Sequence, residues 1–487
     1  MHLESTTEWE QVRQRFREIW GYNDFRAPQG EVVQCLLAGR DALVVMPTGG
    51  GKSICFQLPA LLQRGLTLVV SPLVALMENQ VQELRERRVP AAVLHSQLGK
   101  SERRKVLWQI QQQQLRLLYL SPETLLNPAV WNVLCEPQVS IRALVLDEAH
   151  CLAQWGDSFR PAYRRLGMVR EALLAHKPAG SRMAIAAFTA TADPQTQQII
   201  QSVLQLQHPQ QICVNPYRPN LALSVQTVWT PRGRRKRVHQ FVQQHRGESG
   251  LVYARTRRGT EALAEWLTQQ GDRTVAYHAG LSPQERRRIE AAWLGGELPF
   301  VVCTSAFGMG INNSAVRWVM HFQAPALLSE YVQEVGRAGR DGQPAQALTL
   351  ISEPTGWFDP TDRQMGRYFA QRERSLQQLA HRLHRRIPSE GEIRAIAHQH
   401  TDGELVLAWL HRQGYVEWVG PFHYRLIAAN PVGKQWRNRQ NASAMAAYLA
   451  RPTCRWQAIL AAFGFAAEAK TLRCGTCDRC RAKRRST

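Results

Sequence analysis

A glycine-rich segment near the start of the chain has the residue types that bind the phosphates of a nucleotide. The apolar run Leu43–Val45 is followed by residues 46–53, which read Met-Pro-Thr-Gly-Gly-Gly-Lys-Ser. Backbone N–H groups of such a loop surround phosphate oxygens, Lys52 can reach the β- and γ-phosphates, and Ser53 can ligate Mg²⁺. The usual pattern has a glycine in place of Met46, but small residues still precede a Lys-Ser pair that opens a helix. The segment predicts a nucleotide site formed by Thr48, Gly49, Gly50, Gly51, Lys52 and Ser53.

Two adjacent carboxylates follow another apolar run. Residues 144–146, Leu-Val-Leu, lead into residues 147–150, Asp-Glu-Ala-His. In nucleotide hydrolases a carboxylate at such a position holds Mg²⁺, and a neighbouring group orients or deprotonates the attacking water. Asp147 is therefore predicted to ligate Mg²⁺ with Ser53, and Glu148 to act on the water. The glycine loop alone would be weak evidence, but the two segments together predict a site for ATP and Mg²⁺.

A later segment carries positive charge that could complete such a site. Residues 333–342 read Gln-Glu-Val-Gly-Arg-Ala-Gly-Arg-Asp-Gly, so Arg337 and Arg340 lie three apart on one helical face or turn. An arginine supplied from a second lobe can stabilise charge on the γ-phosphate. Most surface arginines only form salt bridges, but this run after an apolar strand is typical of helicase ATPases. Gln333, Arg337 and Arg340 are predicted to be catalytic, with Arg340 the preferred arginine finger.

Further runs occur in an order that resembles the RecQ-type DNA helicases of superfamily two. They are residues 21–29, 71–77, 119–123, 188–192, 277–281 and 306–312, and the resemblance covers roughly residues 15–352. It implies that Tyr22, Arg26 and Gln29 read adenine, and the Gln amide can pair with adenine edges. It also implies that the runs at 71–77 and 119–123 bind a DNA strand.

The resemblance implies an ATP-dependent DNA helicase that moves 3′ to 5′ on single-stranded DNA and unwinds duplexes in repair or recombination. Two lobes would bind ATP between them, and hydrolysis would move the strand. Two alternatives stay open: an RNA helicase of the same superfamily, and a DNA-dependent ATPase that translocates without robust unwinding. The expected partners are single-stranded DNA and tailed or branched duplexes, with repair or single-strand-binding proteins as further candidates.

An aromatic-rich segment follows the paired carboxylates directly. Trp155, Phe159 and Tyr163 recur every four residues, a spacing that also fits core packing on one helical face. Arg160 stands among them, which favours a sensor of nucleic acid in which bases stack on the rings. These residues are predicted to bind DNA. The related helicases commonly have His-Asp where residues 157–158 are Asp-Ser, which puts that one contact in doubt.

Four cysteines near the end of the chain have metal-ligand spacing. Cys474, Cys477 and Cys480 form C-x₂-C-x₂-C, and Cys454 lies upstream. Four thiolates fit a tetrahedral structural zinc site. An iron–sulfur cluster is the alternative, but it usually has its own nearby fourth cysteine. The residues around Cys454 also resemble the zinc subdomain of RecQ helicases, so zinc is preferred.

Apolar runs alternate with helix-like stretches, which predicts an α/β fold of two tandem RecA-like parallel-sheet lobes. We expect lobe one at 1–207 and lobe two at 208–352. A smaller C-terminal region at 353–487 would hold a winged-helix-like segment at about 387–430 and a zinc subdomain at about 440–482. The hairpin around Gly420-Pro421 and the helix 403–413, closed by Gly414, carry the winged-helix prediction. This order departs from that of a typical RecQ helicase, and we expect a short form without an HRDC domain.

The composition favours a polyanionic partner. The chain has 487 residues, a formal charge of +22, and 14 Trp, 14 Phe and 11 Tyr, which supply positive charge and base-stacking rings. No apolar run approaches the ~18 residues of a membrane span, and the N-terminus lacks the apolar part of a signal peptide. We therefore expect a cytoplasmic, nucleoid-associated protein with no membrane partner.

Overall fold

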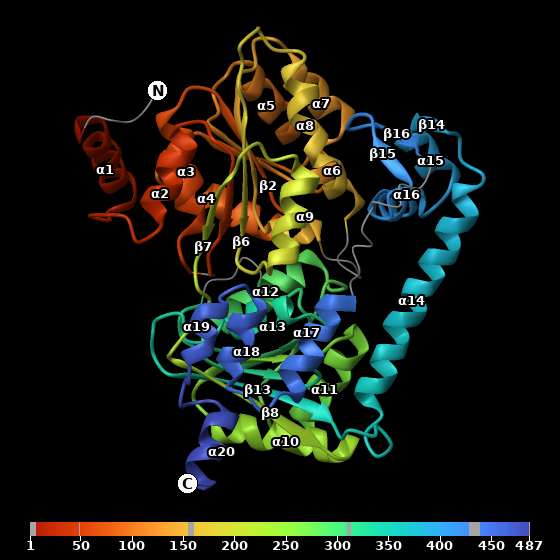
Figure 1. Ribbon diagram of the computed structural model, residues 1–487. Helices are drawn as coiled ribbons and strands as arrows, with labels where there is room; N and C mark the ends of the chain where they lie inside the picture. The colour runs from red at the N-terminus through yellow and green to blue at the C-terminus, as the bar shows by residue number, and fades with distance from the viewer. Residues whose placement is uncertain (1–5, 48, 154–159, 309–312, 428–438, 487) are drawn as a thin grey trace. The chain divides into compact units, whose positions relative to one another are not determined.

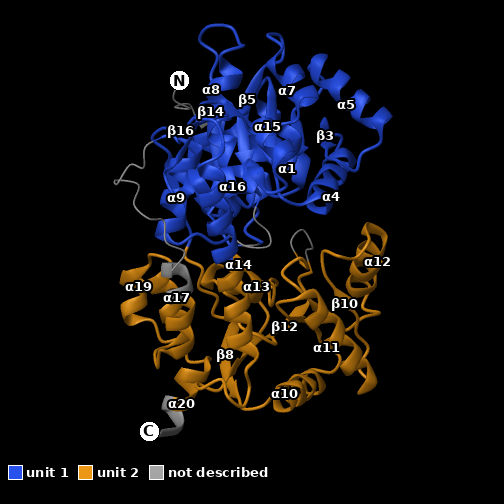
Figure 2. Cartoon of the chain, turned by 90° about the vertical axis from the view of Figure 1, so that its right-hand side faces the viewer, with its two compact units in different colours: residues 1–214, 373–436 blue, residues 215–372, 437–487 orange. Residues whose placement is uncertain are grey.

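The computed structural model describes residues 6–47, 49–153, 160–308, 313–427 and 439–486, and these form two units (Figure 2). Unit 1 comprises residues 1–214 and 373–436, and unit 2 comprises residues 215–372 and 437–487. The boundary between the lobes therefore follows residue 214, because the strand at 210–213 belongs to the first sheet. The C-terminal region does not form a unit of its own, since its first part belongs to unit 1 and its second part to unit 2.

Unit 1 is built on a seven-stranded parallel sheet with the order β3-β4-β2-β5-β6-β1-β7. Figure 1 labels β2, β6 and β7 of this sheet. The strands are β1 (Ala42–Val45), β2 (Leu66–Val70), β3 (Ala91–Leu94), β4 (Leu117–Leu120), β5 (Ile141–Leu146), β6 (Ala184–Thr189) and β7 (Gln210–Cys213). The helices are α1 (Thr6–Trp20), α2 (Gln29–Leu37), α3 (Lys52–Leu62), α4 (Val74–Glu86), α5 (Lys100–Gln111), α6 (Pro122–Leu125), α7 (Pro128–Cys135), η1 (Ala149–Leu152), η2 (Pro161–Met168), α8 (Val169–Leu174) and α9 (Pro194–Leu204).

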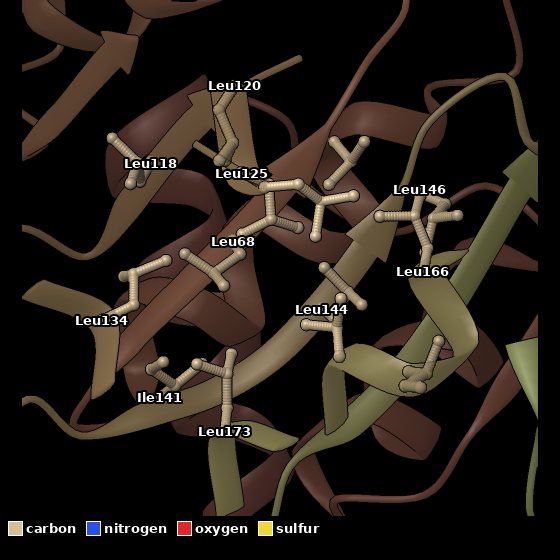
Figure 3. Packing of buried hydrophobic residues seen from close by; sticks show 14 of the residues in the cluster. Leu68, Leu118, Leu120, Leu125, Leu134, Ile141, Leu144, Leu146, Leu166 and Leu173 are labelled. Carbon is tan, nitrogen blue, oxygen red and sulfur yellow. The ribbon is translucent and has the colours of Figure 1, made fainter. Parts of the chain in front are cut away.

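Both faces of this sheet are covered, as the continuous apolar strands predict. Successive residues of β1 alternate between the two cores, with Leu43 in one and Val44 in the other. The core that contains Val44 packs on α2, α3 and α4. The core that contains Leu43 packs on α5 to α9 and η2, and its leucines interlock around β2, β4 and β5 (Figure 3). The predicted parallel-sheet lobe is confirmed, and its carboxyl edge carries the predicted nucleotide segments.

Unit 2 has a six-stranded parallel sheet with the order β10-β11-β9-β12-β13-β8. Its strands are β8 (Leu221–Val228), β9 (Ser249–Tyr253), β10 (Ala276–Tyr277), β11 (Phe300–Cys303), β12 (Val316–His321) and β13 (Ala345–Ser352). Helices α10 (Pro231–Gln244) and α11 (Arg257–Gln269) cover one face. Helices α12 (Pro283–Leu294) and α13 (Leu328–Val335) cover the other, so the second RecA-like lobe is confirmed.

The cysteine-bearing end of the chain shares the core of unit 2. It consists of α17 (Arg439–Ala450), α18 (Arg455–Ala462), α19 (Ala466–Thr471) and α20 (Asp478–Ser486). The indole Nε1 of Trp456 donates to the Leu221 carbonyl of β8 at 3.0 Å. The hydroxyl of Tyr448 donates to that of Tyr331 on α13 at 2.7 Å. These buried contacts make the segment part of the lobe rather than an appendage.

The winged-helix-like segment belongs to unit 1. The chain enters it along α14 (Thr361–His384), and its elements are β14 (Glu390–Glu392), α15 (Ile393–Gln399), α16 (Gly403–Arg412), β15 (Val416–Trp418) and β16 (His423–Leu426). The strands form an antiparallel sheet of order β14-β16-β15, and Gly414 has φ +78, as expected of a glycine after a helix end. The segment docks on η2 and α7, because Arg165 donates to the Pro421 carbonyl at 3.1 Å and Trp131 meets the Phe422 ring. Among the described residues no helix is long and apolar enough to cross a membrane.

Candidate nucleotide, DNA and zinc sites

The phosphate loop joins β1 to α3 in unit 1. Gly49 and Gly51 have φ +84 and +77, in the left-handed region that favours glycine. Gly51 is the N-cap of α3 and supplies no side-chain cap, an arrangement that would allow the first amides of the helix to bind an anion. Lys52 Nζ donates to the Met46 carbonyl at 3.2 Å, which holds the amine against the loop. Ser53 follows in the first turn, and Thr48 lies outside the described residues.

Gln29 connects the predicted adenine segment to the phosphate loop. Its side chain is buried, its Nε2 donates to the Gly50 carbonyl at 2.9 Å, and its Oε1 accepts from the Arg26 N–H at 3.0 Å. A Cβ at Gly51 would lie 2.2 Å from Gln29 Nε2, so the amide needs a glycine there. Tyr22 is half exposed and its ring lies 5.8 Å from that of Phe16. The structure therefore brings Gln29 to the loop and leaves Tyr22 and Arg26 at the surface.

The paired carboxylates lie at the carboxyl end of β5. Strand β6 separates β5 from β1, so the two predicted segments emerge from one edge of the sheet, about 10 Å apart at normal strand spacing. Burial and the adjacent Glu148 raise the pKa of Asp147 to about 6, whereas Lys52 acts to lower it. The glycine loop and Asp147 thus lie at the same edge of the sheet, the edge at which open α/β sheets bind ligands.

Glu148 is buried beside His150. Its backbone has φ +51, and the residue is only 8 % exposed. The Nδ1 of His150 lies 3.2 Å from Glu148 Oε2 and 3.0 Å from the hydroxyl of Thr189, which ends β6. His150 and Thr189 therefore connect the carboxylate to the run at 188–192. Sequence reasoning missed this positioning role, although both residues stand inside runs that it had singled out.

Gln333, Arg337 and Arg340 lie in unit 2. Gln333 is buried within α13, and Arg337 is buried in the turn that follows. Arg337 donates to the Gly308 carbonyl, and a Cβ at Gly308 would lie 2.5 Å from the guanidinium carbon. Arg337 is thus engaged inside its own lobe. Arg340 is half-buried and follows Gly339, which has φ +61.

Of the four predicted DNA-binding residues, the structure describes Arg160 and Tyr163. Trp155 and Phe159 lie outside the described residues. Arg160 pairs with Glu123 at 3.2 Å and so connects the aromatic-rich segment to the run at 119–123. Tyr163 is 0 % exposed in the core around β5, which favours the core-packing interpretation of this residue over a direct contact with DNA. Tyr163 belongs to η2, and its ring packs η2 against the core. Core packing was the alternative that the four-residue spacing also allowed.

The four cysteines meet in space. Their Sγ atoms all lie within 4.8 Å of one another, and Cys477 is fully buried. The N–H groups of Cys474, Cys477 and Cys480 each donate to a neighbouring cysteine sulfur at 3.4 Å. Amide donors favour the thiolate form that binds metal. Zinc–sulfur bonds of about 2.3 Å place tetrahedral sulfurs about 3.8 Å apart, so this cluster fits zinc.

The comparisons with known proteins agree with this geometry. Three family profiles match: DEAD/DEAH box helicase at residues 26–200, helicase conserved C-terminal domain at 233–342, and RecQ zinc-binding at 423–481. The chain is 54% identical over 473 residues to the ATP-dependent DNA helicase RecQ of Synechocystis, which covers 96% of this chain and 98% of that protein. The chain belongs to the RecQ family. This RecQ-family chain is also 40% identical to the RecQ of Pasteurella multocida, over 70% of its own length and 52% of that protein's.

A relative in Bacillus subtilis, the probable ATP-dependent DNA helicase RecS, is 39% identical over 70% of this chain and 66% of its own length. Solved structures share the fold at lower identity. The Mycobacterium smegmatis helicase Lhr bound to ssDNA and AMP-PNP has a TM-score of 0.57 at 23% identity, over 72% of this chain and 47% of that one. Yeast Dbp5 bound to RNA and ADP BeF3 has a TM-score of 0.56 at 15% identity, over 73% and 90%.

Proposed function

We propose that this chain hydrolyses ATP to move 3′ to 5′ along single-stranded DNA and to unwind duplexes during repair or recombination. As a member of the RecQ family, the protein is an ATP-dependent DNA helicase. The observation that carries the proposal is the 54% identity to a RecQ helicase over 96% of the chain. Polarity and cellular role are inferred from the family resemblance. A cytoplasmic, nucleoid-associated location follows from the proposed substrate.

The ATP site is proposed to form on the carboxyl edge of the unit 1 sheet. The first amides of α3 and Lys52 would bind the β- and γ-phosphates. Ser53 and Asp147 would ligate Mg²⁺, which neutralises charge on those phosphates. Glu148, oriented by His150 at 3.2 Å, would position the attacking water and accept its proton.

Three residues are proposed to bind the base of ATP. Tyr22 offers an exposed ring for stacking, and Arg26 further along the same segment is also exposed. The amide of Gln29 contacts both the Arg26 N–H and the Gly50 carbonyl. Adenine binding to Gln29 would therefore act directly on the position of the Gly50 carbonyl in the phosphate loop.

Arg340 is proposed as the arginine finger. Since a finger acts mainly in the transition state, Arg340→Ala should lower kcat by about 10³-fold and change the Kd for ATP only a few-fold. Steady-state ATPase kinetics beside nucleotide binding would measure both. The exposed Arg246 provides a control, because Arg246→Ala should leave kcat unchanged. A collapsed ATP affinity with normal kcat would make Arg340 a ground-state binder instead.

Residues 153–163 are proposed to couple strand binding to hydrolysis through Trp155, Phe159 and Arg160. Support comes from the sequence position of the segment, directly after Glu148, and from the pair of Arg160 with Glu123. A displacement of Arg160 when DNA binds would also disturb Glu123, its ion-pair partner. Stimulation of the ATPase by single-stranded DNA is the property that this coupling would produce.

Strand displacement on tailed duplexes tests the whole proposal. A duplex with a 3′ single-stranded tail should be unwound in the presence of ATP and Mg²⁺, and one with a 5′ tail should not. Single-stranded DNA should stimulate hydrolysis in both experiments. Stimulated hydrolysis without displacement would favour the translocase alternative. Displacement of RNA duplexes but not DNA duplexes would favour an RNA helicase.

A further inference from the structure

Three exposed aromatic side chains gather on unit 2 where β8 and β13 end. Trp229 follows β8, and Trp357 and Phe358 lie between β13 and α14. Figure 1 labels these three elements. Their exposed fractions are 62%, 79% and 64%, and the rings of Trp229 and Phe358 lie 6.4 Å apart. We call these residues the aromatic cluster. Large apolar groups exposed together commonly mark a binding site, and none of the three belongs to the runs discussed above.

The backbone beneath the aromatic cluster is fixed by buried hydrogen bonds. Glu353 is 2% exposed and accepts from the Thr355 N–H at 2.6 Å and from the Phe358 N–H at 3.0 Å. Asp359 is fully buried and pairs with Arg234, itself fully buried in the first turn of α10, at 2.7 Å. The rings are therefore held outward by an ordered scaffold rather than by a loose loop. A rigid scaffold is what a stacking surface requires.

The charges around the aromatic cluster are segregated. The carboxylates of residues 353–362 turn inward, since Glu353 and Asp359 are buried and Asp362 pairs with Arg234 at 3.2 Å. The outward charges are basic and exposed: Arg232, Arg235, Lys236 and Arg363. Arg363 stands beside the cluster, because a Cβ at Gly356 would lie 3.5 Å from its Cβ and Cδ. Exposed rings with surrounding cations complement a polyanion that has unpaired bases.

We propose that the aromatic cluster is an additional binding site for single-stranded DNA. Unpaired bases stack on Trp357, Phe358 and Trp229, and phosphates pair with Arg232 and Arg363. A duplex keeps its bases stacked inside and offers no faces to these rings, which is why the proposal names a single strand. The proposal rests on the proposed function only in that the protein works on DNA. It extends the path of the strand to a part of unit 2 outside the family's runs.

Equilibrium binding of labelled oligo-dT of increasing length to the full chain tests the proposal. Loss of two stacking rings in Trp357→Ala/Phe358→Ala should weaken binding of long strands at least ~10-fold and leave short strands within two-fold. The single variant Trp357→Phe keeps an aromatic ring at this position and should retain most of the wild-type affinity for long strands. Trp108 is 53% exposed on α5 in unit 1, so Trp108→Ala is a matched control that should bind normally.

Photocrosslinking locates the contact independently of any substitution. A long strand that carries 5-iodouracil should crosslink to the peptide containing residues 353–363 of the wild-type chain. No crosslink there, together with unchanged long-strand affinity in the double variant, would overturn the proposal. If the double variant binds DNA normally but loses a labelled peptide of alternating Glu and Phe, the cluster is a peptide site instead. Failure of the helicase proposal is distinguishable, because wild-type ATPase would then show no stimulation by DNA.

Discussion

Glu148→Gln should bind ATP with near wild-type affinity and hydrolyse it at least ~10²-fold more slowly. The substitution keeps the shape of the side chain and its contact with His150 but removes the group that can take a proton. Lys52→Ala should instead weaken ATP binding and also slow turnover, since it removes charge from the phosphates. Nucleotide binding and single-turnover hydrolysis, each with and without single-stranded DNA, would separate the two effects.

A carboxylate outside the site provides the control for this prediction. Glu102 is exposed on α5 of the same unit, so Glu102→Gln should leave binding and turnover unchanged. All variants should melt at the wild-type temperature, because neither Lys52 nor Glu148 is needed for the packing of the sheet. Normal turnover in Glu148→Gln would show that Glu148 does not take part in the hydrolytic step. Its contact with His150 would then have no catalytic role.

The chemistry of the nucleotide site could be predicted from sequence because it is local. A strand, a glycine loop and a helix start are consecutive in the chain, and parallel strands bring their carboxyl ends to one edge. The link from Gln29 to Gly50 spans only 21 residues. By contrast, the contact that docks the winged-helix-like segment joins Arg165 to Pro421 across 256 residues. Local pattern fixes the segment's fold but not the surface on which it packs.

Other features carry weaker or ambiguous signals in the sequence. Strand β8 alternates Leu221, Leu223 and Val225 with smaller or polar residues, so its signal is a period of two rather than a continuous apolar run. Strand β7 is a short edge strand of mostly polar residues and carries little signal. For Tyr163, the spacing of aromatic residues fitted both core and DNA contact. The burial of the ring in the structure favours the core.

Cys477→Ser should remove the zinc and destabilise unit 2 as a whole. The wild-type chain should contain one zinc ion, because the four sulfurs fit a single tetrahedral site. Metal-binding energy in such a site is folding energy, and loss of one ligand should cost on the order of 4 kcal/mol, or roughly 8–16 °C in Tm. Metal analysis and thermal melting of the purified proteins would measure both quantities.

The destabilisation should extend to the lobe that carries Arg340, because the zinc segment and the second sheet share one core. Trp456 is buried against β8, and Arg455 pairs with Asp478 at 2.8 Å beside the cysteines. When the metal is lost, this packing loosens, so DNA-stimulated ATPase should fall together with Tm. Cys213 is exposed on β7 of unit 1, and Cys213→Ser should change neither zinc content nor Tm. A brown wild-type protein with iron and sulfide would overturn the zinc assignment, whereas an unchanged Tm in zinc-free Cys477→Ser would show that the shared core holds without its metal.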